Sequence, residues 1–135
     1  MKTPEEIVNI MLKNDAFSQW LGVELLEIKL GFCRLKAKIT AEMLNGFSIA
    51  HGGISYSLAD SALAFASNSK GNLSVSIETS ISHLKKVSEN DELTATCIEI
   101  NRGKTIGLYR VEIKNQANLL VAVFNGTVHI SQKLW

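Results

Sequence analysis

Proline, cysteine and net charge are all scarce in this chain: its 135 residues include one proline and two cysteines, and the formal net charge is +1. This near-neutrality removes any long-range electrostatic attraction to nucleic acid or to an anionic membrane surface. No apolar run approaches the roughly 20 residues that a membrane-spanning helix needs, so we expect no membrane partner. Residues 1–6 contain two acids and no apolar signal-peptide core, which favours cytoplasmic residence.

The two cysteines, Cys33 and Cys97, lie in strand-like segments, without metal-ligand spacing and without a paired redox motif. We expect buried free thiols, because an isolated cysteine commonly packs as a small apolar residue. The sequence offers no cluster of metal ligands, so we expect neither a metal site nor a resident cofactor.

Apolar residues make up 46% of the chain and charged residues 20%, which is ordinary for a soluble globular protein. At this length, one domain over residues 1–135 with a single core is the simplest organisation. Thr3, Pro4 and the acids that follow predict the start of a helix. A second short helical turn is expected to place Trp20, so residues 1–20 form an N-terminal helical segment.

Alternation of apolar and polar residues predicts six strands, interrupted by one long helix. The strands are expected at residues 23–30, 32–40, 74–82, 92–100, 105–114 and 119–130, and the helix from the Gly-Gly pair at 52–53 to about residue 71. Tight connections between the later strands imply antiparallel pairing. Both side-chain sets of the last strand are apolar, so this strand should be central and covered on both faces.

The order of these elements predicts an α+β fold, in which a curved antiparallel sheet of about six strands wraps around one long central helix. The helix is rich in alanine and serine, whose small side chains let a sheet approach closely. One helix leaves much of the apolar sheet surface open, so we expect a homodimer or a larger assembly.

Residues 45–66 begin as a polar loop, continue as the long helix, and hold the chemically informative side chains. Gly52 and Gly53 lie where the loop becomes the helix, so their N–H groups are unpaired donors at the positive end of the helix dipole. Asp60 is the only acid in the helix and has no basic residue three or four positions away. An unpaired acid among apolar neighbours favours a functional role over a cap or an ion pair.

The run Asn45-x5-His51-Gly52-Gly53-x4-Leu58-x-Asp60 resembles the hotdog-fold acyl-CoA thioesterases, and in particular their phenylacetate-degradation (PaaI-like) branch. The similarity covers nearly the whole chain, from about residue 20 to residue 130. It implies a hotdog fold and hydrolysis of an aryl (phenylacetyl-type) or short- to medium-chain acyl-CoA to a free acid and coenzyme A. It also implies a homodimer with composite sites, assembled further into a homotetramer, and no cofactor beyond the coenzyme A of the substrate.

By this resemblance, Asp60 matches the acid that either activates water or attacks as a nucleophile, and both roles stay open. His51 matches a residue that orients or polarises the thioester carbonyl, and Asn45 one that holds the acyl group or the attacking water. Ser76 aligns with a position that carries a water-positioning hydroxyl in some relatives. Taken singly, without the family, Asn45 is more typical of a turn, and His51 of a loop residue bonded to backbone.

Hydrolysis of a thioester needs donors aimed at the developing oxyanion and a base or nucleophile near the acyl carbon. Gly53 N–H is the first candidate donor, and Gly52 N–H is the alternative. Gly53 and Asp60 are 60 − 53 = 7 residues apart, or about 10 Å along the helix axis, so one thioester cannot touch both within one helix. We therefore expect Gly53 of one subunit to face Asp60 of a second, antiparallel copy. Burial should also raise the pKa of Asp60.

Further side chains are candidates for substrate binding. Four basic residues could either meet the coenzyme A phosphates or remain solvated in turns: Lys85, Lys86, Arg102 and Lys104. Phe47 adds bulk to the loop before His51 and so affects the size of the acyl pocket, and Tyr56 is expected in the core or the pocket wall. His83 and His129 are expected to be structural or solvent-facing.

Two functions other than hydrolysis are also possible for a chain of this fold. An enoyl-CoA hydratase on the same fold uses a Gly-Asp-x-Asn-Pro-x-His pattern, which is absent from this sequence. A non-catalytic acyl-CoA-binding or sensing module is the stronger rival, and binding without turnover would favour it. Fold resemblance alone does not decide between them, because function depends on the residues of the site.

Overall fold

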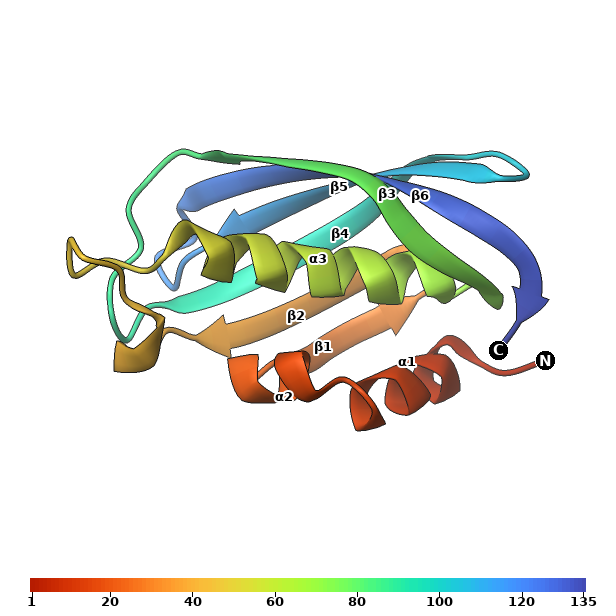
Figure 1. Cartoon of the computed structure of the whole chain (residues 1–135), viewed down its shortest axis with the longest axis horizontal. Helices are drawn as coiled ribbons and strands as arrows, with labels where there is room; N and C mark the ends of the chain where they lie inside the picture. The colour runs from red at the N-terminus through yellow and green to blue at the C-terminus, as the bar shows by residue number, and fades with distance from the viewer.

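The computed structural model describes residues 1–135, and one sheet wraps around one long helix (Figure 1). The elements are α1 (Pro4–Lys13), α2 (Ala16–Leu21), β1 (Glu24–Lys29), β2 (Phe32–Lys38), a short 3-10 turn (Ala41–Met43), α3 (Gly52–Asn68), β3 (Asn72–His83), β4 (Glu92–Arg102), β5 (Ile106–Lys114) and β6 (Leu120–Leu134). The six strands form one sheet in the order β1-β2-β4-β5-β6-β3, and all neighbours are antiparallel. The predicted α+β architecture is confirmed.

The N-terminal helices begin and end where the sequence signals predict. Thr3 caps α1 through a capping box with Glu6, and Pro4 occupies the first turn, where its missing N–H costs nothing. Asp15 caps α2 by accepting the Ser18 N–H at 2.9 Å. These two helices pack against the edge of the core below α3 (Figure 1).

Helix α3 lies very close to the sheet because its buried face consists mainly of small side chains and leucine. On the sheet, Gly126 of β6 faces this helix, and an added Cβ there would lie 2.6 Å from Leu63 Cδ2. A Cβ at that distance would force the Leu63 side chain to move, so glycine lets the helix pack against the sheet without that shift.

The pairing of β3 differs from the prediction. We expected consecutive strands to pair, but β3 pairs with β6, and its other edge is free at the end of the sheet. Residues 84–91 are long enough to carry the chain from one end of the sheet to β4, so no tight turn forces β3 and β4 together. Val75 and Ile77 on β3 are consequently 64% and 58% exposed.

Strand β6 is flanked by β5 and β3, as expected for an interior strand, but it is covered on both faces only at its start. Val121 and Ala122 are both buried, whereas Asn125 and His129 farther along are exposed. The prediction of coverage on both faces therefore holds only at the start of the strand, and from Asn125 onward only the face toward α3 is covered.

The two cysteines are buried free thiols, as predicted. The sequence did not reveal that Cys33 on β2 and Cys97 on β4 stand directly opposite each other in the sheet. Burial raises the pKa of Cys33 to about 12 and that of Cys97 well above its ordinary value, so both thiols stay protonated. None of the helices is long and apolar enough to cross a membrane.

Candidate active site

The loop before α3 is held by its own asparagine. Asn45 Oδ1 accepts the N–H groups of Phe47 at 2.9 Å and Ile49 at 3.4 Å, which is the turn-forming role that this residue type often plays. Its amide nitrogen makes no hydrogen bond within the chain and is available to a ligand. Phe47 at the tip of the loop is 85% exposed and lines neither of the cavities described below.

His51 is the N-cap of α3, and its side chain accepts a hydrogen bond from one of the two glycine N–H groups. Gly53 N–H donates to His51 Nδ1 at 2.9 Å, whereas Gly52 N–H has no acceptor within the chain. The free donor at the positive end of the helix is therefore that of Gly52, the residue that the sequence analysis kept as the alternative.

A cleft of about 350 Å³ opens beside this free amide, and we call it the Gly52 cleft. Asn45, Gly52, His83, Lys85 and Lys86 line it together with Ile49, Ala50, Ser55, Leu84 and Val87. The sequence analysis assigned no ligand role to His83, yet its Nε2 would lie 3.1 Å from a Cβ on Gly52. A side chain at position 52 would push into that imidazole, so glycine keeps the cleft open.

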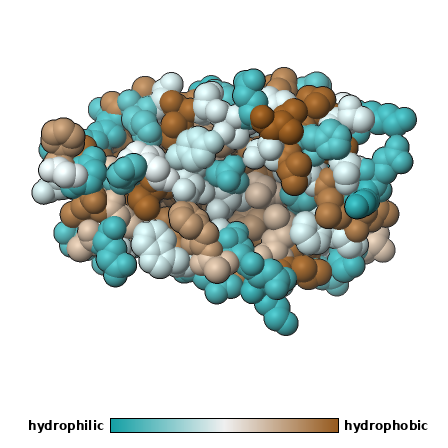
Figure 2. Space-filling model, viewed as in Figure 1, coloured by the Kyte–Doolittle hydropathy of each residue, from teal (hydrophilic) through white to brown (hydrophobic).

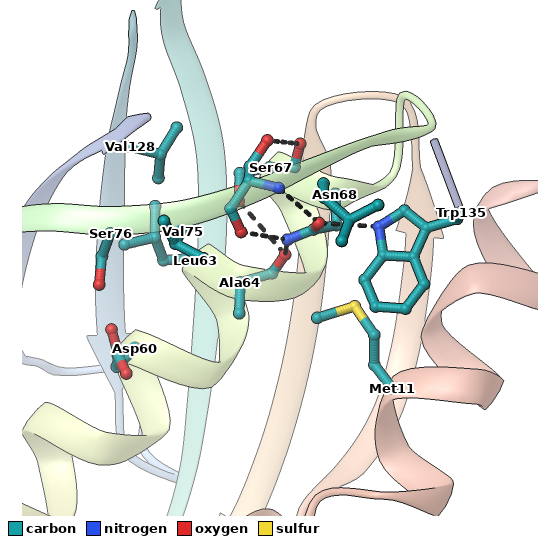
Figure 3. Close-up of a pocket in the computed structure, with 12 residues that line it drawn as sticks. Met11, Asp60, Leu63, Ala64, Ser67, Asn68, Val75, Ser76, Val128 and Trp135 are labelled. Atoms are coloured by element: carbon teal, nitrogen blue, oxygen red, sulfur yellow. Dashed lines mark hydrogen bonds between the residues drawn. The ribbon is translucent and has the colours of Figure 1, made fainter. Parts of the chain in front are cut away.

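Asp60 lies at the middle of α3, half-buried, with no hydrogen bond and no ion pair within the chain. Burial raises the pKa of its carboxyl group above the ordinary value, and the negative charge of Asp15 raises it further. Ser76 of β3 points toward Asp60 from across the cavity that both line (Figure 3).

The cavity beside Asp60 has a volume of about 430 Å³, and we call it the Asp60 cavity. Its lining is Met11, Asp60, Leu63, Ala64, Ser67, Asn68, Leu73, Ser74, Val75, Ser76, Val128 and Trp135. Figure 3 shows Asp60 and Ser76 at one end and Met11 and Trp135 at the other. Sequence reasoning missed the far end, because residues from the two ends of the chain meet there only through the tertiary fold.

The Gly52 cleft and the Asp60 cavity share no residue, so they are two separate pockets within one chain. Gly53, Ser57, Asp60 and Ala64 nevertheless lie on one face of α3 that other elements leave partly exposed. In Figure 2 the middle of the molecular face that carries α3 shows pale and light-brown side chains of intermediate hydropathy, with hydrophilic groups around them.

Two other predicted binding residues, Arg102 and Lys104, line neither the Gly52 cleft nor the Asp60 cavity. Arg102 turns inward, donating from Nη1 to Ser67 O at 3.0 Å and to Tyr109 Oη at 2.9 Å, which corrects the prediction that it either meets phosphates or remains solvated in a turn. Lys104 is exposed on the β4–β5 connection, at the opposite end of the sheet from Lys85 and Lys86 (Figure 1).

Tyr56 packs in the core rather than in a cavity wall. Its ring meets Phe124 edge-on at 5.4 Å between centroids, and its hydroxyl is hydrogen-bonded to Thr79 Oγ1. Of the two alternatives predicted for this side chain, the core position is the one observed.

A curved antiparallel sheet around one long helix, with a glycine pair at the helix start and an unpaired acid farther along it, defines the class of hotdog-fold proteins with a thioester-hydrolase site. Residues 47–122 match the model of the thioesterase superfamily. The chain belongs to this superfamily and, within it, to the PaaI-like acyl-CoA thioesterases. It is a thioester hydrolase.

Individual relatives support the assignment over most of the chain. A putative esterase of Archaeoglobus fulgidus is 41% identical over 93% of this chain and 81% of its own length. The acyl-coenzyme A thioesterase PaaI of Escherichia coli is 40% identical over 88% of this chain and 85% of its own. The solved structure of that E. coli protein superposes with a TM-score of 0.95, covering 97% of this chain and 95% of its own at 37% identity.

A Streptococcus mutans protein, solved bound to acetyl-CoA, has a TM-score of 0.81 at 25% identity and covers 84% of this chain and 91% of its own.

Proposed function

We propose that this protein hydrolyses an acyl-CoA to a free acid and coenzyme A, with Asp60 at the reacting carbon. The single observation that carries the proposal is the unpaired, half-buried Asp60 carboxylate at the mouth of an apolar cavity. An acid with a raised pKa and no partner in the fold is the kind of group that takes a proton or attacks a carbonyl. The E. coli relative, an acyl-coenzyme A thioesterase, supports the same reaction.

The reaction requires a second copy of the chain. The Gly52 cleft and the Asp60 cavity are separate within one chain. An antiparallel α3 from a partner would bring the Gly52 cleft of one subunit against the Asp60 cavity of the other. The exposed face of α3 and the free edge of β3, with exposed Val75 and Ile77, are the surfaces such a homodimer would cover. Further assembly into a homotetramer remains a prediction from the family resemblance.

In this composite site the Gly52 N–H of one subunit would hold the carbonyl oxygen of the thioester, where negative charge develops. Gly53 N–H supports this donor indirectly, because it fixes His51 as the helix cap. One such donor is typically worth about 3 kcal/mol in the transition state. The free amide nitrogen of Asn45 lies in the same cleft and is a second donor for the acyl carbonyl or the attacking water.

Asp60 of the partner then completes the chemistry in one of two ways. As a general base it takes a proton from water while the water oxygen bonds to the acyl carbon and the C–S bond breaks, releasing coenzyme A thiolate. As a nucleophile it bonds to the acyl carbon while the C–S bond breaks and coenzyme A thiolate leaves, and water then hydrolyses the resulting anhydride to the free acid and the Asp60 carboxylate. Ser76, which points toward Asp60, would position the water in either case.

The coenzyme A portion is expected to leave the site over Lys85 and Lys86, which rim the Gly52 cleft and are exposed. Its phosphates would meet two mobile ammonium groups rather than a glycine-rich loop, so binding there should weaken as salt is raised. The S. mutans neighbour, solved with acetyl-CoA, shows that this fold accommodates such a ligand.

The test is release of coenzyme A from a panel of phenylacetyl, hydroxyphenylacetyl, short-chain and long-chain thioesters. Turnover that Asp60→Asn abolishes, with an unchanged circular dichroism spectrum and an unchanged oligomer, supports the proposal. Binding of acyl-CoA without release from any thioester in the panel would instead identify a non-catalytic binding module.

A further inference from the structure

We propose that the acyl group of the preferred substrate is an unsubstituted, medium-length chain of about ten carbons, and that Met11 and Trp135 set its maximum length. The inference rests on the proposed function, because it places the acyl carbon beside Asp60. It goes beyond that function by choosing among the acyl groups that the family resemblance leaves open.

The length follows from the position of the Asp60 cavity along α3. The cavity extends from Asp60 to Asn68, and these residues are 68 − 60 = 8 positions apart, or about 12 Å along the helix axis. A fully extended chain advances roughly 1.2 Å for each backbone bond, since a residue with three bonds spans about 3.5 Å. About ten bonds therefore fill the cavity, whereas a phenylacetyl group would leave its far half empty.

The far end is a fixed wall rather than a flexible surface. Trp135 donates its indole N–H to Asn68 Oδ1 at 2.8 Å, and its backbone N–H to Gly71 O at 3.0 Å. Asn68 is itself buried and anchored, because its amide nitrogen donates to Ala64 O at 2.8 Å and to Ser74 O at 3.0 Å. Met11 of α1 closes the remaining side, opposite the indole in Figure 3.

The polar groups near this wall have no hydrogen-bond donor left for a substrate hydroxyl group. Asn68 Oδ1 accepts the Ser74 N–H at 2.8 Å as well as the indole N–H, and its amide hydrogens are both used. The Ser67 and Ser74 hydroxyls donate to backbone carbonyls. Beyond Asp60 and Ser76 the other lining residues are apolar, so the oxygen of a hydroxyl on the acyl group would be buried without a hydrogen-bond donor.

The first experiment measures kcat/KM of the wild-type protein for saturated acyl-CoA thioesters of increasing chain length. We expect a rise to about ten carbons and a fall of at least 10-fold beyond about twelve, because additional methylenes would have to enter the wall. Trp135→Ala should move the fall to longer chains, whereas Trp135→Phe, which keeps an aromatic ring but loses the bond to Asn68, should keep it near its original length.

Trp20→Ala is the matched control, because Trp20 is about half exposed on α2 and contacts Phe17 rather than the cavity. Its chain-length profile should equal that of the wild type. If Trp135→Ala does not fold, Met11→Ala makes the same test, since it removes the other half of the wall.

The second experiment compares decanoyl-CoA with the same thioester carrying a hydroxyl at the last carbon. We expect the hydroxylated substrate to lose about 10- to 100-fold in kcat/KM, which is what an apolar pocket typically achieves against one unpaired polar group. Met11→Gln should reduce this loss several-fold, because glutamine has nearly the volume of methionine and supplies an amide at the wall.

Two results separate failure of this inference from failure of the proposed function. No turnover of any thioester by the wild-type protein would sink both. Turnover with a flat chain-length profile, or with a limit that neither Trp135→Ala nor Met11→Ala moves, would overturn the inference and leave the hydrolase standing.

Discussion

Two acids near α3 differ in almost every physical respect. Glu99 on β4 accepts from Lys70 Nζ at 2.7 Å and from the Tyr109 hydroxyl at 2.8 Å, whereas Asp60 accepts nothing from the protein. Burial alone would raise the pKa of Glu99, but its bonds to Lys70 and Tyr109 and the charge of Arg102 lower it overall. Burial and the charge of Asp15 both raise the pKa of Asp60. The fold thus gives the Glu99 carboxylate hydrogen-bond partners and leaves the Asp60 carboxylate without any, so that Asp60 is available to a substrate.

The two shifts have opposite consequences for stability. The lowered pKa of Glu99 contributes stability above its unfolded value, and that contribution is lost as pH falls through its folded pKa. The raised pKa of Asp60 contributes stability below its unfolded value, and that contribution is lost as pH rises through its folded pKa. At neutral pH, Glu99 therefore stabilises the fold and ionised Asp60 destabilises it.

The largest expected effect is on activity. Asp60→Asn removes the base or nucleophile while keeping the size of the side chain, so kcat should fall by about 10²- to 10⁴-fold. Coenzyme A release measures this loss. The matched control is Glu99→Gln, which should keep the wild-type kcat where it is folded; equal losses in both variants would mean that the contrast between the two acids is wrong.

The second effect is on stability at the paired acid. Glu99→Gln leaves Lys70 and Arg102 without their carboxylate, and we expect a loss of about 2 kcal/mol in the free energy of unfolding, because hydrogen bonds to charged groups are worth this much. Urea unfolding at pH 7 measures it. The two side chains of the Lys70–Glu99 pair are 32% and 21% exposed, so raised salt should reduce the difference.

A smaller effect in the opposite direction is expected at Asp60. Asp60→Asn should raise the free energy of unfolding at pH 7 by about 1 kcal/mol, as is common when a strained functional group is replaced. The gain should vanish below the ordinary pKa of an aspartate, where the wild-type side chain is also neutral. A gain that does not depend on pH would contradict the assignment of a raised pKa.

The smallest effect concerns the neighbour that acts on Asp60. In the wild type, kcat/KM should fall as pH drops through the raised pKa of Asp60. Asp15→Asn removes one negative charge yet keeps a good N-cap for α2, so this acid limb should move to lower pH with little change in stability. A pH-rate profile of the two proteins measures the shift, and an unmoved limb would exclude Asp15 as a contributor.

Local sequence signals predict the elements well and the long-range contacts poorly. The glycine pair and the small residues after it predict helix α3. The absence of any basic neighbour on the same helix identifies Asp60 as an unpaired acid. His51 is not a usual N-cap residue, so nothing in the sequence showed that it would occupy Gly53 N–H. In the sequence Arg102 looks like a solvated turn residue, because its partners Ser67 and Tyr109 come close to it only in the folded chain.

The far wall of the Asp60 cavity could not be predicted from the sequence for the same reason. Met11 and Trp135 come from opposite ends of the chain, and no periodicity or motif connects them. Their positions in one cavity depend on β6 running alongside β3 at the edge of the sheet, which the expectation of consecutive pairing did not include.

The facing pair Cys33 and Cys97 has a practical consequence for every assay proposed above. Because both sulfurs are sealed inside the sheet and protonated, the native enzyme should not react with an aromatic disulfide reagent, and the colour that develops during turnover should report coenzyme A alone. Unfolding should release two reactive thiols per chain, so the same reagent also counts the fraction of molecules that have lost their structure.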